Sequence, residues 1–140
     1  MERFAFTLTS VTSAGEISDT LRFTGNGRMK KTADGWLLRY TGRDEDGNAV
    51  TSSLKLWDDG RRAVILNDAY HLPLDAEGDT DVALPGPGGT LALTAVTRRL
   101  FWRMGEHDGE ITLDYTLRQG GSPAANMHLT MDLEEERETI

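Results

Sequence analysis

Apolar and polar residues alternate along most of this chain, and the alternation predicts β-strands. Successive side chains of a strand point to opposite faces, so a period of two collects the apolar residues of each segment on one face. The polar residues between them, such as Thr112 and Asp114, then face water. The alternating apolar positions are Phe4, Phe6 and Leu8; Ile17, Leu21 and Phe23; Trp36, Leu38 and Tyr40; Val50, Leu54 and Leu56; Ile111, Leu113, Tyr115 and Leu117; and Met127, Leu129, Met131 and Leu133.

Glycines divide the chain at intervals that indicate hairpins. The chain has 15 glycines, and most of the gaps between them are about 8 to 13 residues, the spacing of a β-meander. Asp-Gly pairs favour tight turns because glycine adopts a positive φ without steric cost. We expect turns at Asp34-Gly35, Asp46-Gly47, Asp59-Gly60 and Asp108-Gly109, with further glycine punctuation at Gly15, Gly25, Gly27, Gly78, Gly88 and Gly120.

These strands predict an all-β fold with a closed sheet. Each segment has one apolar face to bury, and about nine or ten short strands are too many for a single open sheet with one covered face. Closing the sheet also removes its unpaired edges. We therefore predict a single antiparallel up-and-down β-barrel over residues 1–133, followed by an acidic C-terminal tail, 134–140.

The segment from Thr90 to Met104 fits two interpretations. Leu93, Val96 and Leu100 are spaced as on a helix, whereas Leu91 and Leu93 alternate as on a strand. The segment is rich in β-branched residues, which favour strands, so we expect a long bent strand with a helix as the alternative. The Pro- and Gly-rich run at 85–89 is expected to form a loop before it.

The order of these segments resembles the YwiB-like family of small bacterial proteins, a family of unknown function. The strongest agreement is the predicted closing hairpin, formed by 109–117 and 126–131. The resemblance implies a calycin-like (lipocalin-like) β-barrel with an internal cavity, and it carries over no catalytic residues. Weaker agreement covers Phe23-Thr24-Gly25, Gly35 to Tyr40, Leu54-Lys55-Leu56 and Gly89 to Leu93.

Composition excludes several classes of function. The chain has no cysteine, which removes disulfides, thiolate metal sites and cysteine nucleophiles. Its net charge of -8 opposes general binding to nucleic acids or anionic membranes. The first ten residues alternate where a secretory signal needs a continuous apolar run, and no stretch is apolar enough to span a bilayer. We expect a soluble cytoplasmic protein with neither nucleic-acid nor membrane partners.

No pattern in the chain predicts catalysis, a metal or a cofactor. No serine lies in a nucleophile elbow, and the three histidines are scattered without the spacing of a zinc site. His107, between Glu106 and Asp108, is expected at a solvated turn. The paired carboxylates also fall in predicted turns, where aspartate commonly bonds its own backbone. We expect no catalytic, metal-ligating or cofactor-binding residues, and retain an enzyme using pocket carboxylates as a third alternative.

The leading functional hypothesis is a non-catalytic barrel that binds a small, mostly apolar molecule inside. Barrels of this size are either just filled by side chains or wide enough to hold one small ligand. Large side chains on the apolar faces are the candidates to line such a cavity: Trp36, Tyr40, Trp57, Trp102, Tyr115 and Met131.

A cationic strip supports a different hypothesis. The stretch from Thr90 to Gly105 contains Arg98, Arg99 and Arg103 and no acidic residue, against the overall negative charge. Arginines beside aromatic residues can clamp an anionic ligand or a partner. The alternative function is therefore an interaction or regulatory module that acts through this strip, and the simpler interpretation is ordinary pairing of these arginines with carboxylates of neighbouring strands.

Overall fold

The computed structural model describes residues 1–136, apart from the side chains at 85 and 86, and contains ten strands and no helix within that range. The described residues therefore contain no helix that is long and apolar enough to cross a membrane. The strands are β1 (Arg3–Ala14), β2 (Ile17–Thr32), β3 (Gly35–Arg43), β4 (Ala49–Trp57), β5 (Arg62–Asn67), β6 (His71–Asp75), β7 (Thr80–Gly86), β8 (Gly89–Met104), β9 (Asp108–Gln119) and β10 (Ser122–Glu135).

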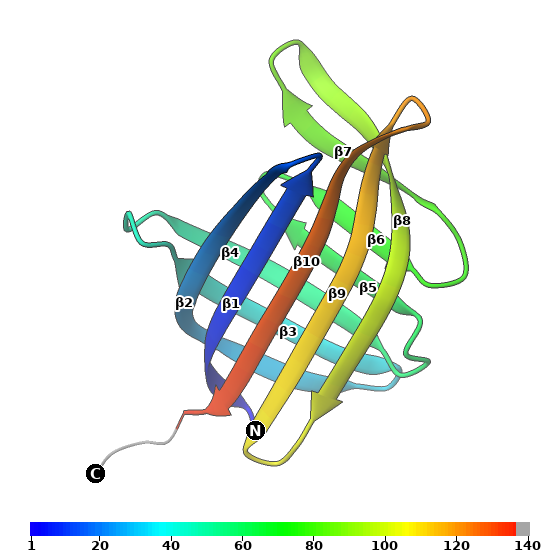
Figure 1. Cartoon of the computed structure of the whole chain (residues 1–140). Helices are drawn as coiled ribbons and strands as arrows, with labels where there is room; N and C mark the ends of the chain where they lie inside the picture. Colours follow the sequence, from blue (N-terminus) through cyan, green and yellow to red (C-terminus); the bar gives the residue numbers. More distant parts are fainter. Residues whose placement is uncertain (137–140) are drawn as a thin grey trace.

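The strands close into one antiparallel up-and-down barrel. Each strand pairs with the next along the chain, and β1 also pairs with β10, where Phe4 lies opposite Glu135. The start of β1 and the end of β10 lie at the lower end of the barrel in Figure 1, and the β1–β2 and β9–β10 turns lie at the upper end. The predicted fold class is confirmed.

The segment from Thr90 to Met104, which fitted either a strand or a helix, is a strand. Strand β8 runs from Gly89 to Met104, pairing with β7 through its first half and with β9 through its second. The register shifts between Thr97 and Arg99, which marks a β-bulge at Arg98. The bulge bends the strand and lets positions such as Leu93 and Leu100, seven residues apart, both face inward.

Several predicted turns are wrong in detail. Only Gly47 (φ 85°) and Gly60 (φ 71°) of the four Asp-Gly pairs have the positive φ of a tight turn. Gly35 begins β3 and Gly109 lies in β9. Gly25 and Gly27 also lie inside a strand, β2, and mark no turn. The predicted loop at 85–89 is mostly paired strand, because Gly86 lies opposite Gly89 across a two-residue turn.

Side chains pack tightly in the half of the barrel that contains the start of β1 and the end of β10. The largest fully buried apolar side chains, each less than 2% exposed, are Phe4, Leu38, Leu54, Leu56, Leu74, Ile111, Leu113 and Met131. Strand β10 continues through Glu134 and Glu135 of the acidic tail, and residues 137–140 of that tail lie outside the described residues.

Candidate functional site

The other half of the barrel is hollow. A cavity of about 400 Å³ lies inside it, and Leu21 and Val50 at its rim are 49% and 40% exposed. The rim therefore opens toward the end with the β1–β2 and β9–β10 turns, where the β7–β8 hairpin projects past the barrel (Figure 1). The wall is formed by Phe6, Leu8, Ser10, Thr12, Leu21, Phe23, Tyr40, Gly42, Val50, Ser52, Ile65, Asn67, Ala69, Tyr70, Leu72, Val82, Leu84, Tyr115, Leu117, Met127 and Leu129.

Small residues in β2 and β3 make room for aromatic rings in and beneath the cavity wall. A Cβ atom at Gly27 would lie 2.5 Å from the Phe4 ring, and one at Gly42 would lie 3.1 Å from the Phe6 ring. Phe6 packs edge-on against Tyr40, with ring centroids 5.1 Å apart. The glycines thus let large rings from β1 and β3 share one side of the barrel.

All three tyrosines of the chain lie in the cavity wall. Tyr40 comes from β3, Tyr70 from the β5–β6 turn, and Tyr115 from β9 on the far side of the barrel. Burial raises the pKa of each phenol above its ordinary value of 10, and the neighbouring tyrosines raise the pKa values of Tyr40 and Tyr115 further. The three side chains are therefore neutral phenols at physiological pH, with O–H groups that can donate hydrogen bonds.

An asparagine holds the polar part of the wall in place. The Asn67 Oδ1 atom accepts hydrogen bonds from the backbone N–H groups of Ala69 and Tyr70, both at 2.9 Å. This Asx-type arrangement fixes the β5–β6 turn and positions Tyr70 over the cavity. The Asn67 Nδ2 atom donates to the Ser52 hydroxyl at 3.3 Å, across the register pair of β4 and β5.

The structure places five of the six candidate cavity residues in three different regions. Tyr40 and Tyr115 lie in the cavity wall. Met131, which is 1% exposed, lies in the packed half. Trp36 and Trp102 are half-buried against the core and are not part of the wall.

Trp57 lies on the outer face of the barrel, which corrects the expectation that it faces inward. Inward side chains of β4 occupy alternate positions through Leu54 and Leu56, so Trp57 points outward. Its ring lies under two cations, with the Arg62 guanidinium 4.9 Å and the Lys55 ammonium 5.6 Å from the ring centroid. Cation–π contacts of this kind suit a half-buried tryptophan on the outer face.

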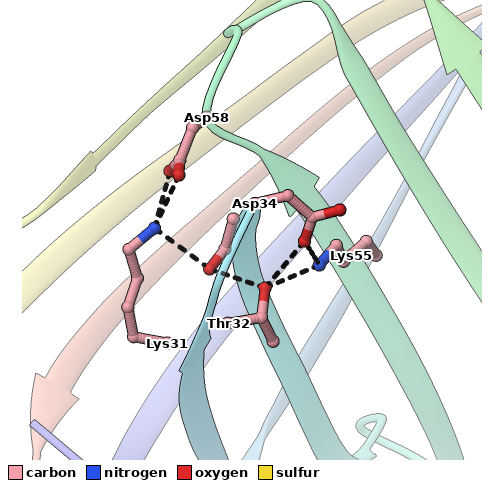
Figure 2. Close-up of polar contacts among 6 residues, drawn as sticks. Lys31, Thr32, Asp34, Lys55 and Asp58 are labelled. Carbon is pink, nitrogen blue, oxygen red and sulfur yellow. Dashed lines mark hydrogen bonds and ion pairs between the residues drawn. The ribbon is translucent and has the colours of Figure 1, made fainter.

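Figure 2 shows a polar network at the packed end of the barrel. Two of its lysines also contact tryptophan rings, Lys31 that of Trp36 and Lys55 that of Trp57. Lys55 bonds Asp34 at 2.6 Å and Thr32 at 2.7 Å, while Lys31 bonds Asp58 at 2.8 Å. The hydrogen bond from Lys55 is the main cause that lowers the pKa of Asp34 below its usual 3.8. The network ties the β2–β3 turn to β4 and the start of the β4–β5 turn, and it has a structural role.

The guanidinium groups of the cationic strip have partners within the chain. Arg98, at the bulge of β8, donates to the Thr116 hydroxyl at 2.6 Å. The Arg99 guanidinium lies 5.5 Å from the centroid of the Phe101 ring. Arg103 contacts Asp108 at 3.2 Å and Glu110 at 3.6 Å, as cross-strand pairing with carboxylates predicts.

Titratable groups do not gather into a metal site anywhere in residues 1–136. No group of three or more histidine, aspartate or glutamate side chains in this range is arranged to hold an ion. His107 contacts Glu106 and Glu135, and His128 contacts Asp114. These pairs lie outside the cavity wall.

Sequence reasoning missed Tyr70, Ser52 and Asn67. A pattern in the inward-facing positions could have revealed them. In β1 the inward series Phe4, Phe6, Leu8 ends in the polar Ser10 and Thr12, and the inward series of β5 ends in Asn67. In β4 the polar Ser52 lies between the inward Leu54 and Val50. Polar side chains at inward positions of neighbouring strands indicate an end of the barrel that water or a ligand enters.

Comparisons with known proteins identify a family and a shared fold. A family described as "Domain of unknown function (DUF1934)" matches residues 7–131. The solved structure of the ywiB protein from Bacillus subtilis superposes with a TM-score of 0.79 at 16% identity, over 97% of this chain and 93% of that chain. No curated protein matches the sequence. The expected resemblance to the YwiB-like family and its barrel is confirmed.

A more distant solved structure extends the likeness in fold. The S-type phycobiliprotein lyase CPES from Guillardia theta superposes with a TM-score of 0.51 at 6% identity. The aligned region covers 99% of this chain and 89% of that chain. At such low identity the likeness describes the barrel and not its chemistry.

Proposed function

This chain belongs to the DUF1934 family, whose description names no function, and we propose that it is a non-catalytic β-barrel that binds one small, mostly apolar molecule in its interior. The observation that carries the proposal is the division of the barrel. One half is filled by buried side chains, and the other encloses a cavity of about 400 Å³ lined chiefly by apolar residues.

The size and lining of the cavity suit a small ligand. Ligand sites are concave and largely apolar, typically about 300 to 1,000 Å³, with a few polar groups that fix orientation. Here the polar groups are concentrated in the phenols, Ser52 and Asn67, with Ser10 and Thr12 on β1. The described wall contains no carboxylate, imidazole or amine that could serve as a general acid or base near neutral pH.

A neutral fluorescent probe tests this proposal directly. N-phenyl-1-naphthylamine is uncharged, mostly apolar and small enough for the cavity, and its fluorescence rises in apolar surroundings. We expect saturable binding at one site per chain. The Leu129→Trp variant places a larger side chain in the wall and is expected to weaken probe binding at least about tenfold.

Leu66→Trp is the matched control, because Leu66 is an exposed residue of β5 outside the cavity wall. This variant should bind the probe as the unaltered protein does. Both variants must first show a cooperative thermal transition, so that lost binding is not lost folding. An absence of saturable binding to the unaltered protein, or equal weakening by both substitutions, would refute the proposal.

A further inference from the structure

We propose that the ligand presents an uncharged carbonyl-type hydrogen-bond acceptor to the phenols of Tyr40, Tyr70 and Tyr115, and that carboxylates of the same size are excluded. This inference rests on the proposed function and names the chemical class that the cavity selects. It follows from the direction of the hydrogen bonds around Asn67 and from the absence of charge in the described wall.

The direction of the hydrogen bonds is fixed at Asn67. Its Oδ1 atom accepts from two backbone N–H groups at 2.9 Å, so the side-chain amide cannot turn over without leaving those donors unpaired. The Asn67 carbonyl is therefore committed to the turn. Only the Nδ2 donor side of the amide is directed toward Ser52.

The Ser52 hydroxyl and the three phenols provide hydrogen-bond donors at the cavity wall. The Ser52 oxygen accepts from Asn67 Nδ2 at 3.3 Å, which leaves the Ser52 O–H to donate at the cavity wall that also contains Tyr40. Tyr40, Tyr70 and Tyr115 line the same cavity, and each neutral phenol carries one O–H group that can donate a hydrogen bond.

A ligand that completes this arrangement must accept hydrogen bonds. Burial disfavours ionisation of all three phenols, so they remain donors throughout the neutral pH range. A carbonyl oxygen has two lone pairs and can accept from two phenols at once. A pure hydrocarbon would leave those donors without partners, which costs free energy in a dry cavity.

An anionic acceptor is disfavoured for an electrostatic reason. The described wall contains no lysine, arginine or histidine that could neutralise a bound carboxylate. Removing an ionised carboxylate from water without a counter-charge is strongly unfavourable. The turns at the open end add negative charge, through Glu16, Asp44, Glu45, Asp46 and Asp68.

Three naphthalenes of matched shape separate the alternatives. 2-Acetylnaphthalene carries a neutral carbonyl, 2-isopropylnaphthalene replaces it with a hydrocarbon group, and 2-naphthoate replaces it with a carboxylate. Competition against the fluorescent probe at pH 7 gives the three affinities. We expect the carboxylate to bind at least about tenfold more weakly than the ketone.

Removal of single hydroxyls tests whether the phenols are the donors. For Tyr40→Phe and Tyr115→Phe, the dissociation constant of the ketone divided by that of the hydrocarbon should rise about 3- to 10-fold. Trp57→Phe, on the outer face, should leave this ratio unchanged. A second readout is the infrared carbonyl stretch of bound 2-acetylnaphthalene, expected at lower frequency than in hydrocarbon solvent and shifted upward in either tyrosine variant.

The possible results distinguish this inference from the proposed function. If the hydrocarbon binds but the tyrosine variants leave the ratio and the carbonyl stretch unaltered, the barrel binds ligands and the inferred acceptor class is wrong. Tight binding of 2-naphthoate at pH 7 would also overturn the inference. If neither neutral compound binds, both the inference and the proposed function fail.

Discussion

At the scale of single residues, the three tyrosines give the cavity its chemical character. The chain contains no other tyrosine, and all three line the same space. The alternation of apolar residues identified Tyr40 and Tyr115 as inward-facing, but Tyr70 follows a strand and belongs to no alternating series. Its position depends on the Asn67 side chain and the turn that Asn67 holds, which strand periodicity does not describe.

The tyrosines predict a loss of stability at high pH. The folded protein holds each phenol proton more tightly than the unfolded chain, whose tyrosines ionise near pH 10. Their stabilising contribution is therefore complete below pH 10 and is lost as pH rises through the raised folded-state pKa values. Near-ultraviolet titration of phenolate should show no tyrosine that ionises at its ordinary pKa before the barrel unfolds.

One result of the titration would contradict the burial of the phenols. Reversible ionisation of the tyrosines near pH 10, with the barrel still folded, would show that the phenols are exposed to water. The Tyr40→Phe variant should reduce the dependence of the unfolding midpoint on pH above 10, since one of the groups responsible is absent.

Gly25 should not tolerate a side chain. A Cβ atom there would lie 1.9 Å from the carbonyl oxygen of Thr41, so β2 and β3 would have to move apart. We expect Gly25→Ala to lower the free energy of unfolding by about 1 to 3 kcal/mol, measured by urea denaturation. Gly78→Ala, where nothing lies within 4 Å of the added atom, should change it by less than about 0.5 kcal/mol. Equal effects of the two substitutions would contradict this explanation.

At the scale of elements, alternation predicted the strands and their faces. It did not predict the height of each residue, that is, its position along the barrel axis. Met131 and Leu129 face the same interior, yet Leu129 lies in the cavity wall and Met131 in the packed half. Periodicity assigns a face, whereas height depends on the register between strands. The error at Trp57 has a different source, because Trp57 follows the inward Leu56 directly and therefore has the opposite direction.

Strands β6 and β7 have the shortest pairing of any two neighbouring strands in the described sheet. In the described part of the chain these strands share one register pair, His71 with Ala83, whereas β9 and β10 are paired almost from end to end. Regions with few backbone hydrogen bonds open locally at low free-energy cost. Hydrogen exchange measured by mass spectrometry should therefore be fastest, among the strands, in β6 and β7.

The exchange prediction bears on the cavity, because Leu72 of β6 and Val82 of β7 both lie in its wall. A bound neutral ligand should slow exchange in these strands more than in β9 and β10. If backbone amides of β6 and β7 are as well protected from exchange as those of β9 and β10 in the free protein, the prediction is wrong, because the pairing of β6 with β7 is then as stable as the rest of the sheet.

At the scale of the whole molecule, the barrel is divided into a packed half and a hollow half. The packed half supplies the buried apolar core, with Phe4 and Leu113 among its fully buried side chains. This rigid base holds the cavity wall in place, which reduces the ordering that ligand binding requires. The sequence predicted a closed barrel of about nine or ten strands, but not this division, because the division follows from the combined register of all the strands.

Methyl NMR of methionine tests the division and the proposed site together. Met127 lines the cavity, whereas Met29 is 4% exposed and lies in the packed half. With methionine methyl groups labelled with carbon-13, titration with 2-acetylnaphthalene should shift the Met127 signal saturably and leave the Met29 signal nearly in place. No saturable shift at Met127, or shifts of equal size at both methionines, would contradict a barrel that is filled in one half and receptive in the other.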